Sequence, residues 1–292
     1  MHKIVVNMPS EKLLYHYTSL ECLLGIACSK TLRATHIAHL NDSKELMLAI
    51  EHLEREVKKR LQNEQLNSED RKCLVQLSEW LNHRFLLEHL LFTCSFTKAG
   101  NLLSQWRAYC PPSAGVSLGF NPQELLVAAE AQEFQLVECV YNQAMQCNLV
   151  NAWLDLVLTT KNEKEEPASK SHPSQSYYSH FRANEEAFLQ VAARMKHHAF
   201  SEEKEWRLIS KVSKSLRDPK LKFRAGKTRL IPYIEFELPL TEAQTLSLGH
   251  VYIGPAQDHN ISFSAIATFL SNSGARISSG ISACGIPLRN WW

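Results

Sequence analysis

The chain has 292 residues, of which 45% are hydrophobic and 21% charged, and its formal net charge is +2. This length supports a sizeable core, and the near-neutral charge excludes the profile of a general nucleic-acid or membrane-surface binder. No run of about 18 apolar residues occurs, so we expect no transmembrane helix. The eight cysteines include no CxxC pair, which favours a reducing, cytoplasmic setting over a disulfide framework or a structural zinc site.

The first 90 residues are predicted to be mainly helical. Residues 13–18 form a short strand, and a short helix follows at 19–28 with Ser19 as its N-cap. After a loop at 35–42, apolar residues recur at the helical period over 43–62 and again over 68–90. These two long helices are expected to form a helical insert covering about residues 43–90.

Strands become frequent in the rest of the chain. In the middle, Asn121, Pro122 and Glu124 form the signature of a helix start, and the polar stretch 161–176 is predicted to be an exposed loop. The predicted strands are 90–97, 115–120, 135–142, 203–212, 221–225, 229–238, 250–255 and one within 276–284, and the predicted helices are 101–110, 177–198 and 262–274. Helices followed by antiparallel-type strands, without a βαβ rhythm, predict a single α+β domain over 1–292.

Three local clusters are candidates for a functional site. In the first strand, alternation places His16 and Thr18 on one face and Tyr15 and Tyr17 on the other, so the polar pair could meet a ligand. The alternative is a core histidine with a satisfied hydrogen bond.

The second cluster is Ser95 with Trp106 and Tyr109, whose two aromatic residues share one face of a short helix. Aromatic pairs of this kind more often belong to a core than to a ligand platform.

The third cluster lies in a late predicted strand, where Glu203, Glu205 and Arg207 point one way and Trp206 the other. Two carboxylates this close are expected to raise each other's pKa, which suits a site that handles a cation or a hydroxyl proton. A plain exposed strand face is the alternative.

Common phosphate, hydrolase and metalloprotease motifs are absent from the sequence. His36 and His39 are spaced HxxH, but zinc needs further ligands that this loop does not supply, so no metal site is expected.

Taken in order, the segments LYHYTS, LNDSKE, CSFT, SQWRAY, GVSLGF, EKEWRLI, HVYIGP and IPLR resemble a bacterial domain family of unknown function. The shared motifs are YHYT, NDxxE, SxWxxY, GxxxGF, ExEWR and IPxR, and they span residues 13 to 290. That family in turn resembles the ADP-ribosyltransferase superfamily. The resemblance implies split antiparallel β-sheets around a cleft that binds NAD as substrate.

The resemblance also implies roles for particular residues. His16 and Thr18, with the neighbouring Tyr17, would hold the adenosine ribose. Ser95, Trp106 or Tyr109 would supply the middle motif at the nicotinamide end. The catalytic carboxylate would be Glu205, with Glu203 as its upstream partner and as the open alternative.

Arg207 would join the cofactor-binding set, and Arg289 in the terminal IPLR would reach the cleft rim to pair with a phosphate or an acidic group. The alternative for Arg289 is a surface ion pair.

The resulting expectation is an enzyme that cleaves NAD and transfers ADP-ribose to a macromolecular acceptor, protein or nucleic acid, as a toxin or phage-defence effector. A neutralising partner protein fits that role, and no membrane partner is expected. Two alternatives stay open: an NAD glycohydrolase using the same pocket, and a catalytically inert module that binds a nucleotide or a partner. The basic residues between Lys211 and Arg229 are compatible with nucleic acid but do not establish it.

Overall fold

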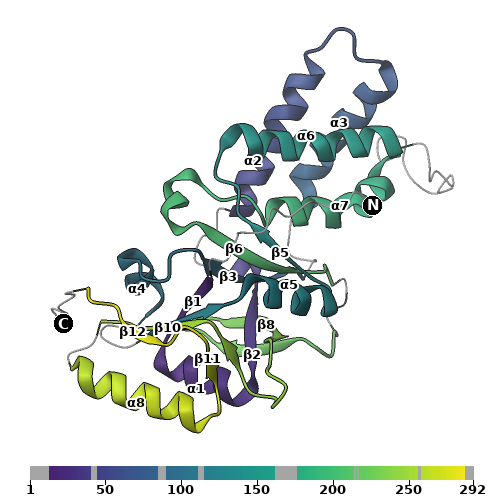
Figure 1. The fold of residues 1–292 in the computed structure, drawn as a ribbon. Coiled ribbons are helices and arrows are strands. Elements are labelled where there is room, and N and C mark those ends of the chain that lie inside the picture. Colours follow the sequence, from purple (N-terminus) through teal and green to yellow (C-terminus); the bar gives the residue numbers. More distant parts are fainter. Residues whose placement is uncertain are drawn as a thin grey trace.

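The computed structural model describes residues 13–40, 45–84, 90–110, 115–161, 176–213, 215, 217–255 and 258–286. It combines a large branched β-sheet with a group of helices that stands to one side of it (Figure 1). The α+β class is therefore confirmed. None of the helices in these ranges is long and apolar enough to cross a membrane.

The helices and strands follow one another along the whole chain. The helices are α1 (Leu20–Ser29), η1 (Ile37–His39), α2 (Glu45–Leu61), α3 (Ser68–Arg84), α4 (Leu103–Tyr109), α5 (Pro122–Ala131), α6 (Gln143–Thr160), α7 (Tyr178–Ala192), η3 (His198–Glu203) and α8 (His259–Asn272). The strands are β1 (Leu14–Thr18), β2 (Thr31–His36), β3 (Phe92–Thr97), β4 (Val116–Phe120), β5 (Phe134–Glu138), β6 (Glu205–Ser210), β7 (Lys222–Ala225), β8 (Leu230–Glu237), β9 (Ser247–Leu248), β10 (His250–Ile253), β11 (Arg276–Ile277) and β12 (Ile281–Ala283).

Ten of these strands form one sheet, in the order β12-β10-β4-β1-β3-β2-β8-β7, with β6 joined to β3 and β5 joined to β6. Its pairs are antiparallel except for β10 with β12, and β9 and β11 form a separate parallel pair. The expectation of two separate packed sheets is thus corrected to one continuous sheet, because β3 connects all the arms.

Strand β3 is the branch point of the sheet. One of its edges pairs with β6 from Thr93 to Thr97. On the other edge, Thr97 pairs with Tyr15 of β1 and Thr93 pairs with Thr35 of β2. Between them, the carbonyl oxygen of Ser95 is bonded by a side chain of β1 instead of by a strand. The sheet therefore splits along this edge, with the β1 arm on one side and the β2 arm on the other.

Both predicted helix starts are formed as expected. Ser19 Oγ accepts a hydrogen bond from the Cys22 amide at the start of α1. Asn121 Oδ1 accepts from the amides of Gln123 and Glu124 at the start of α5, with Pro122 in the first turn. Side-chain caps of this kind satisfy amides that have no partner inside the helix.

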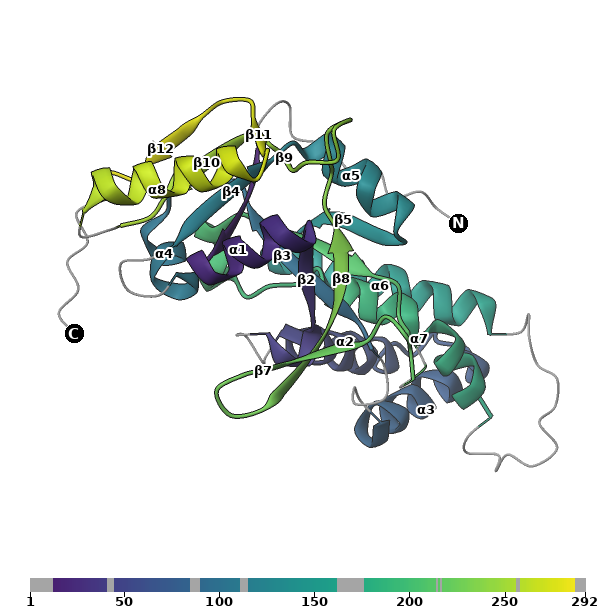
Figure 2. The ribbon, with the colours of Figure 1, turned by 90° about the horizontal axis from the view of Figure 1, so that it is seen from below.

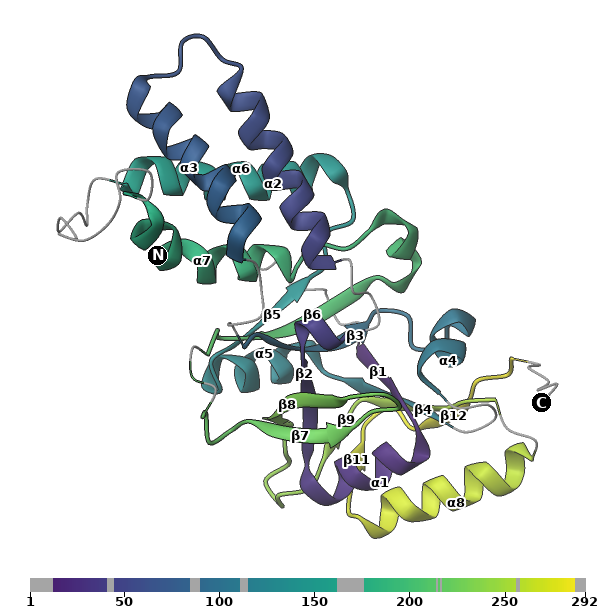
Figure 3. The same cartoon turned by 180° about the vertical axis from the view of Figure 1, so that it is seen from behind.

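Helices α2, α3, α6 and α7 form a helical unit with its own core, including Leu53, Trp80, Trp153, Phe181 and Phe188 (Figures 1 and 3). The predicted insert at 43–90 supplies only α2 and α3. Their apolar stripes are covered by α6 and α7, which come from a later part of the chain. The helical unit is therefore larger than the predicted insert, and α6 was not predicted.

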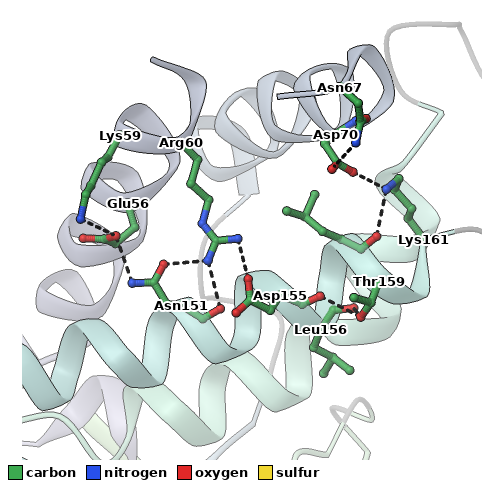
Figure 4. A network of polar contacts seen from close by, with 11 residues as sticks. Glu56, Lys59, Arg60, Asn67, Asp70, Asn151, Asp155, Leu156, Thr159 and Lys161 are labelled. Atoms are coloured by element: carbon green, nitrogen blue, oxygen red, sulfur yellow. Dashed lines mark hydrogen bonds and ion pairs between the residues drawn. The ribbon is translucent and has the colours of Figure 1, made fainter. Parts of the chain in front are cut away.

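Polar contacts join α2 to α6 within this helical unit (Figure 4). Arg60 of α2 donates to Asn151 Oδ1 at 2.8 Å and pairs with Asp155 at 2.7 Å, both on α6. Asn151 in turn donates to Glu56 Oε2 at 3.0 Å. These contacts fix the register of α2 against α6 around the apolar core.

Candidate functional site

A cavity of about 50 Å³ lies where β1, β3, β6 and α4 meet, at the split of the sheet. Six of the predicted site residues line it: His16, Tyr17, Ser95, Tyr109, Glu203 and Glu205. They come from segments nearly 190 positions apart in the sequence. The strands β1, β3 and β6 are adjacent, which is why residues so distant in sequence meet here.

Three other predicted residues do not line the cavity. Thr18 and Trp106 are buried, and Trp106 packs edge-on against the ring of Tyr17 at 4.6 Å between centroids. Arg207 is 1% exposed and lies behind the cavity wall. Arg289 falls outside the described residues.

His16 is held at the split by its ring. Its Nδ1 lies 3.0 Å from the Ser95 carbonyl oxygen. Because a carbonyl oxygen can only accept, the neutral ring must carry its proton on Nδ1, which leaves Nε2 as an acceptor. Burial lowers the pKa of His16, and the bond to Ser95 opposes this only in part. The ring is therefore neutral at pH 7.

The strand register revises which side of β1 faces the carboxylates. Tyr15 pairs with Thr97, and Thr97 pairs with Glu205, so these three side chains share one face of the sheet. By alternation Tyr17 shares it, while His16 and Thr18 belong to the opposite face. His16 nevertheless reaches the cavity, because the sheet opens beside it.

Tyr17 and Tyr109 shape the α4 side of the cavity. The Tyr17 hydroxyl donates to the Ala99 carbonyl and accepts from the Leu102 amide, both at 2.7 Å, and so fixes the start of α4. Tyr109 ends α4 and is 38% exposed, whereas Trp106 on the same helix is buried. The two aromatic residues thus separate into a core residue and a cavity residue.

The two carboxylates come from different elements, which corrects the prediction that one strand carries both. Glu203 ends η3, and Glu205 begins β6. Lys204 between them adopts a left-handed conformation, with φ 44° and ψ 49°. This turn is uncommon for a residue with a Cβ, and it lets both side chains face the same cation.

That cation is Lys196, in the segment between α7 and η3. Its Nζ lies 2.5 Å from Glu203 Oε2 and 2.5 Å from Glu205 Oε2. Arg207 holds Glu205 from the other side, through Nε to Oε1 at 2.7 Å and Nη2 to Oε2 at 3.1 Å. Arg207 also donates to the Ala193 carbonyl at 2.9 Å. The alternative of a plain exposed strand face is wrong, since Lys196, Glu205 and Arg207 are all buried.

These cations reverse the expected pKa shift of Glu205. Burial alone would raise its pKa, but Arg207 and Lys196 together outweigh burial and lower it to about 2. Burial would likewise lower the pKa of Lys196, and the neighbouring carboxylates raise it instead. Both groups are therefore charged at pH 7, and the prediction that the carboxylates raise each other's pKa is corrected.

Backbone contacts fix this ion network in place. The Glu205 amide donates to the Tyr141 hydroxyl at 2.9 Å, and its carbonyl accepts from the Cys139 amide at 3.0 Å. On α6, Gln146 Nε2 donates to the Lys196 carbonyl at 2.9 Å, while its Oε1 meets Nε2 of His52 on α2 at 3.1 Å. The helical unit thereby holds the segment that carries Lys196.

Sequence reasoning missed Lys196 and Tyr141. The helix predicted at 177–198 ends at Ala192, so Lys196 lies in a loop rather than on a helix face. The usable signal was the position of Glu205 in a strand with buried neighbours. A carboxylate buried there requires a cation close to it. That argument gives the need for a partner but not its identity.

Among the described residues, no group of three or more His, Cys, Asp or Glu side chains could hold a metal ion. The rings of His36 and His39 lie 5.7 Å apart at the end of β2, with His36 packed against Phe92.

A family model described as a protein of unknown function, DUF2971, matches residues 105–208. This range begins in α4 and ends in β6, so it contains Tyr109, Lys196, Glu203, Glu205 and Arg207. Strands β1 and β3, with His16 and Ser95, lie outside it. No curated protein matches the chain, and no solved structure matches it either.

Proposed function

We propose that the protein is an ADP-ribosyltransferase-like enzyme that cleaves NAD and transfers ADP-ribose to a macromolecular acceptor, in the manner of a toxin or phage-defence effector. The observation that carries this proposal is the convergence of His16, Ser95 and the two carboxylates Glu203 and Glu205 on one cavity. A histidine, a middle serine or aromatic residue and a late glutamate are the set that the sequence resemblance implies.

The chemistry of His16 supports the role of a ribose anchor. Its Nε2 is an acceptor on a neutral ring, so it can take a hydrogen bond from a sugar hydroxyl without bringing a positive charge to the site. A cationic histidine there would oppose the positive charge that builds on the sugar as the nicotinamide bond breaks.

The two carboxylates support different roles in this proposal. Both oxygens of Glu205 are bonded to cations, whereas the contacts of Glu203 to Lys196 involve only Oε2. The Glu203 side chain is also the more exposed of the two, at 15% against 5%. We therefore assign the direct contact to the nicotinamide ribose to Glu203, with Glu205 holding Lys196 beside it.

In the reaction, the sugar becomes cationic as nicotinamide departs. A fixed carboxylate stabilises that charge more than it stabilises the neutral ground state, which is the basis of its effect on rate. Lys196 shares its charge between two carboxylates, so Glu203 keeps part of its negative field. The cavity of about 50 Å³ is far smaller than a dinucleotide, so most of NAD would lie outside it.

One observation favours the inert binding module instead. Both oxygens of the Glu205 carboxylate are bonded to Arg207 or Lys196, as expected of a group that holds β6 against the segment between α7 and η3. In that case the protein would bind a nucleotide or a partner without releasing nicotinamide.

The test is incubation of the full chain with NAD labelled in its adenosine, with and without cell lysate. The transferase releases nicotinamide and places the label on a macromolecule only when lysate is present. Equal nicotinamide release without any labelled acceptor would replace the transferase by a glycohydrolase. Binding of NAD without nicotinamide release in either arm would establish the inert module.

A further inference from the structure

The segment 211–229 is the most basic part of the chain. It contains eight of the 32 lysines and arginines but only one acidic residue, Asp218, so it carries +7 where the whole chain carries +2. This asymmetry is hidden in the overall composition. A local basic stretch of this kind is the usual electrostatic footprint for a polyanion.

The structure places the end of this segment on an exposed hairpin, formed by β7 and β8 at one edge of the sheet (Figure 2). Lys222 and Arg224 share one face of β7, and Lys227 and Arg229 lie in the turn, which is closed by a bond from the Gly226 amide to the Arg229 carbonyl at 2.9 Å. Four basic side chains are therefore gathered within eight residues.

Few of these charges are neutralised. In the described part of the segment, ion pairs join Lys222 to Glu235 and Lys211 to Glu133. Among the described residues no ion pair involves Arg224, Lys227 or Arg229. Among the described residues, therefore, no carboxylate neutralises the exposed side chains of Lys227 and Arg229 at the tip of the hairpin.

An aromatic ring accompanies the charge. Phe223 lies on the opposite face of β7 from Lys222 and Arg224 and is 58% exposed, and Leu230 at the start of β8 is 67% exposed. Exposed apolar residues on an edge strand are a liability unless they meet a partner. Basic side chains that follow a phosphate backbone, with an aromatic ring on which a base can stack, are the features that bind single-stranded nucleic acid.

We propose that the β7–β8 hairpin, residues 222–230, is a binding surface for single-stranded nucleic acid. The surface lies at the β7–β8 edge of the sheet, away from the cavity. The tip end of β8 lies beside the part of β2 that pairs with Thr93, whereas Glu205 lies beside Thr97 at the other end of β3. Binding there does not depend on NAD cleavage, so either proposal can fail alone.

The experiment is a fluorescence-anisotropy titration of the full chain, without NAD, using a labelled 20-nucleotide single strand of DNA, the same sequence as RNA, and the DNA duplex, at 50 to 200 mM salt. We expect the single strands to bind more tightly than the duplex. Arg224→Glu with Lys227→Glu should weaken binding more than tenfold. It should also make the slope of log K against log salt shallower by about 1.4, at about 0.7 per phosphate contact.

Phe223→Ala should weaken single-strand binding about fivefold to 100-fold with little change in the salt slope, because stacking is not ionic. The matched control is Lys58→Glu with Lys59→Glu on the exposed side of α2, which makes the same change in charge and should alter binding less than twofold. Arg224→Gln with Lys227→Gln repeats the test without introducing acidic side chains.

Three results would overturn the proposal. The first is that neither single strand binds at 50 mM salt. The second is that the hairpin and α2 variants lose affinity equally. The third is that the duplex binds more tightly than the single strands and that Phe223→Ala does not change its affinity. The last would point to a duplex surface, and the second to nonspecific attraction by total charge. If the basic residues serve only to block strand addition at this edge, the glutamate variants stay monomeric and nucleic acid does not bind.

Discussion

The two ends of β6 lie at two hollows of opposite character. At its start, Glu205 faces a cavity of about 50 Å³ whose charges are buried and bonded to one another. At its end, Ser210 faces a groove of about 590 Å³ between β5 and β8, where the ion pairs are exposed. In Figure 3 the two ends are separated by the length of the strand.

The two hollows differ both in size and in how firmly their charged groups are held. The groove is larger, but its lysines and carboxylates are solvated and keep their freedom to move. The cavity is small, but it fixes two carboxylates and a neutral histidine in a buried setting, where fields are strong. We therefore propose that the reaction takes place in the cavity and that large partners bind near the groove and the β7–β8 hairpin.

The largest expected difference between the two ends is in stability. Glu205→Gln leaves Arg207 and Lys196 buried beside a neutral group, so we expect a loss of about 3–5 kcal/mol in the free energy of unfolding. The matched control at the other end is Glu235→Gln, which breaks the exposed pair with Lys222 and should cost less than about 1 kcal/mol. Urea unfolding of both variants measures the difference, and equal losses would contradict the assigned burial of the network.

Acid should weaken the same network. The folded pKa of Glu205, about 2, lies below its ordinary value of 4.5, so its stabilisation is complete above about pH 5 and is lost as the pH falls towards 2. This shift corresponds to about 3 kcal/mol. Urea midpoints of the wild type and Glu205→Gln, measured from pH 7 to pH 3, should converge as the pH falls. A constant gap would mean that the ion network does not account for the shift.

A smaller effect is expected where the helical unit holds the site. Gln146→Leu removes the donor to the Lys196 carbonyl and leaves a buried oxygen unpaired, which should cost about 1–3 kcal/mol. If this bond also positions Lys196, the pH at which the network titrates should move towards the ordinary value for a glutamate. A stability loss with an unchanged pH profile would limit Gln146 to a packing role.

The smallest of these effects concerns His16. His16→Ala should weaken NAD binding about tenfold, or about 1.4 kcal/mol, while turnover at saturating NAD is largely kept, because the adenosine ribose does not react. His198→Ala is the control, since His198 is also an exposed ring close to the site in sequence, whereas His197 caps the start of η3. Calorimetric titration gives the affinities, and a loss of turnover without a loss of affinity would reject the anchoring role.

Local signals in the sequence predicted many of the helices and strands. Ser19 and Asn121 were predicted as helix caps because capping depends on one side chain and the adjacent amides. Strand β2 was not predicted, because its short stretch with Arg33 and His36 lacks an apolar run, and its place depends on pairing with β8. Helix α6 was missed for a similar reason, since its place depends on packing against α2 and α7.

The candidate site was predictable in its residue types but not in its bonding. Strand alternation predicted that Glu203 lies in the same strand as Glu205. The chain turns at Lys204 instead, and no periodic pattern in the sequence signals such a turn. The cation Lys196 comes from a different segment, and sequence alone does not select it among the nearby lysines. The sign of the Glu205 pKa shift depends on that choice, which is why it was predicted wrongly.

The most direct test of the account is the rate of nicotinamide release by Glu203→Gln. The variant keeps the size of the side chain and a hydrogen-bonding group but removes the charge proposed to stabilise the cationic sugar. We predict a loss of about 100- to 1000-fold in rate with NAD affinity nearly unchanged, and a rate close to wild type for the exposed neighbour control, Glu202→Gln. Wild-type release by Glu203→Gln would contradict the assignment of this carboxylate to the reaction.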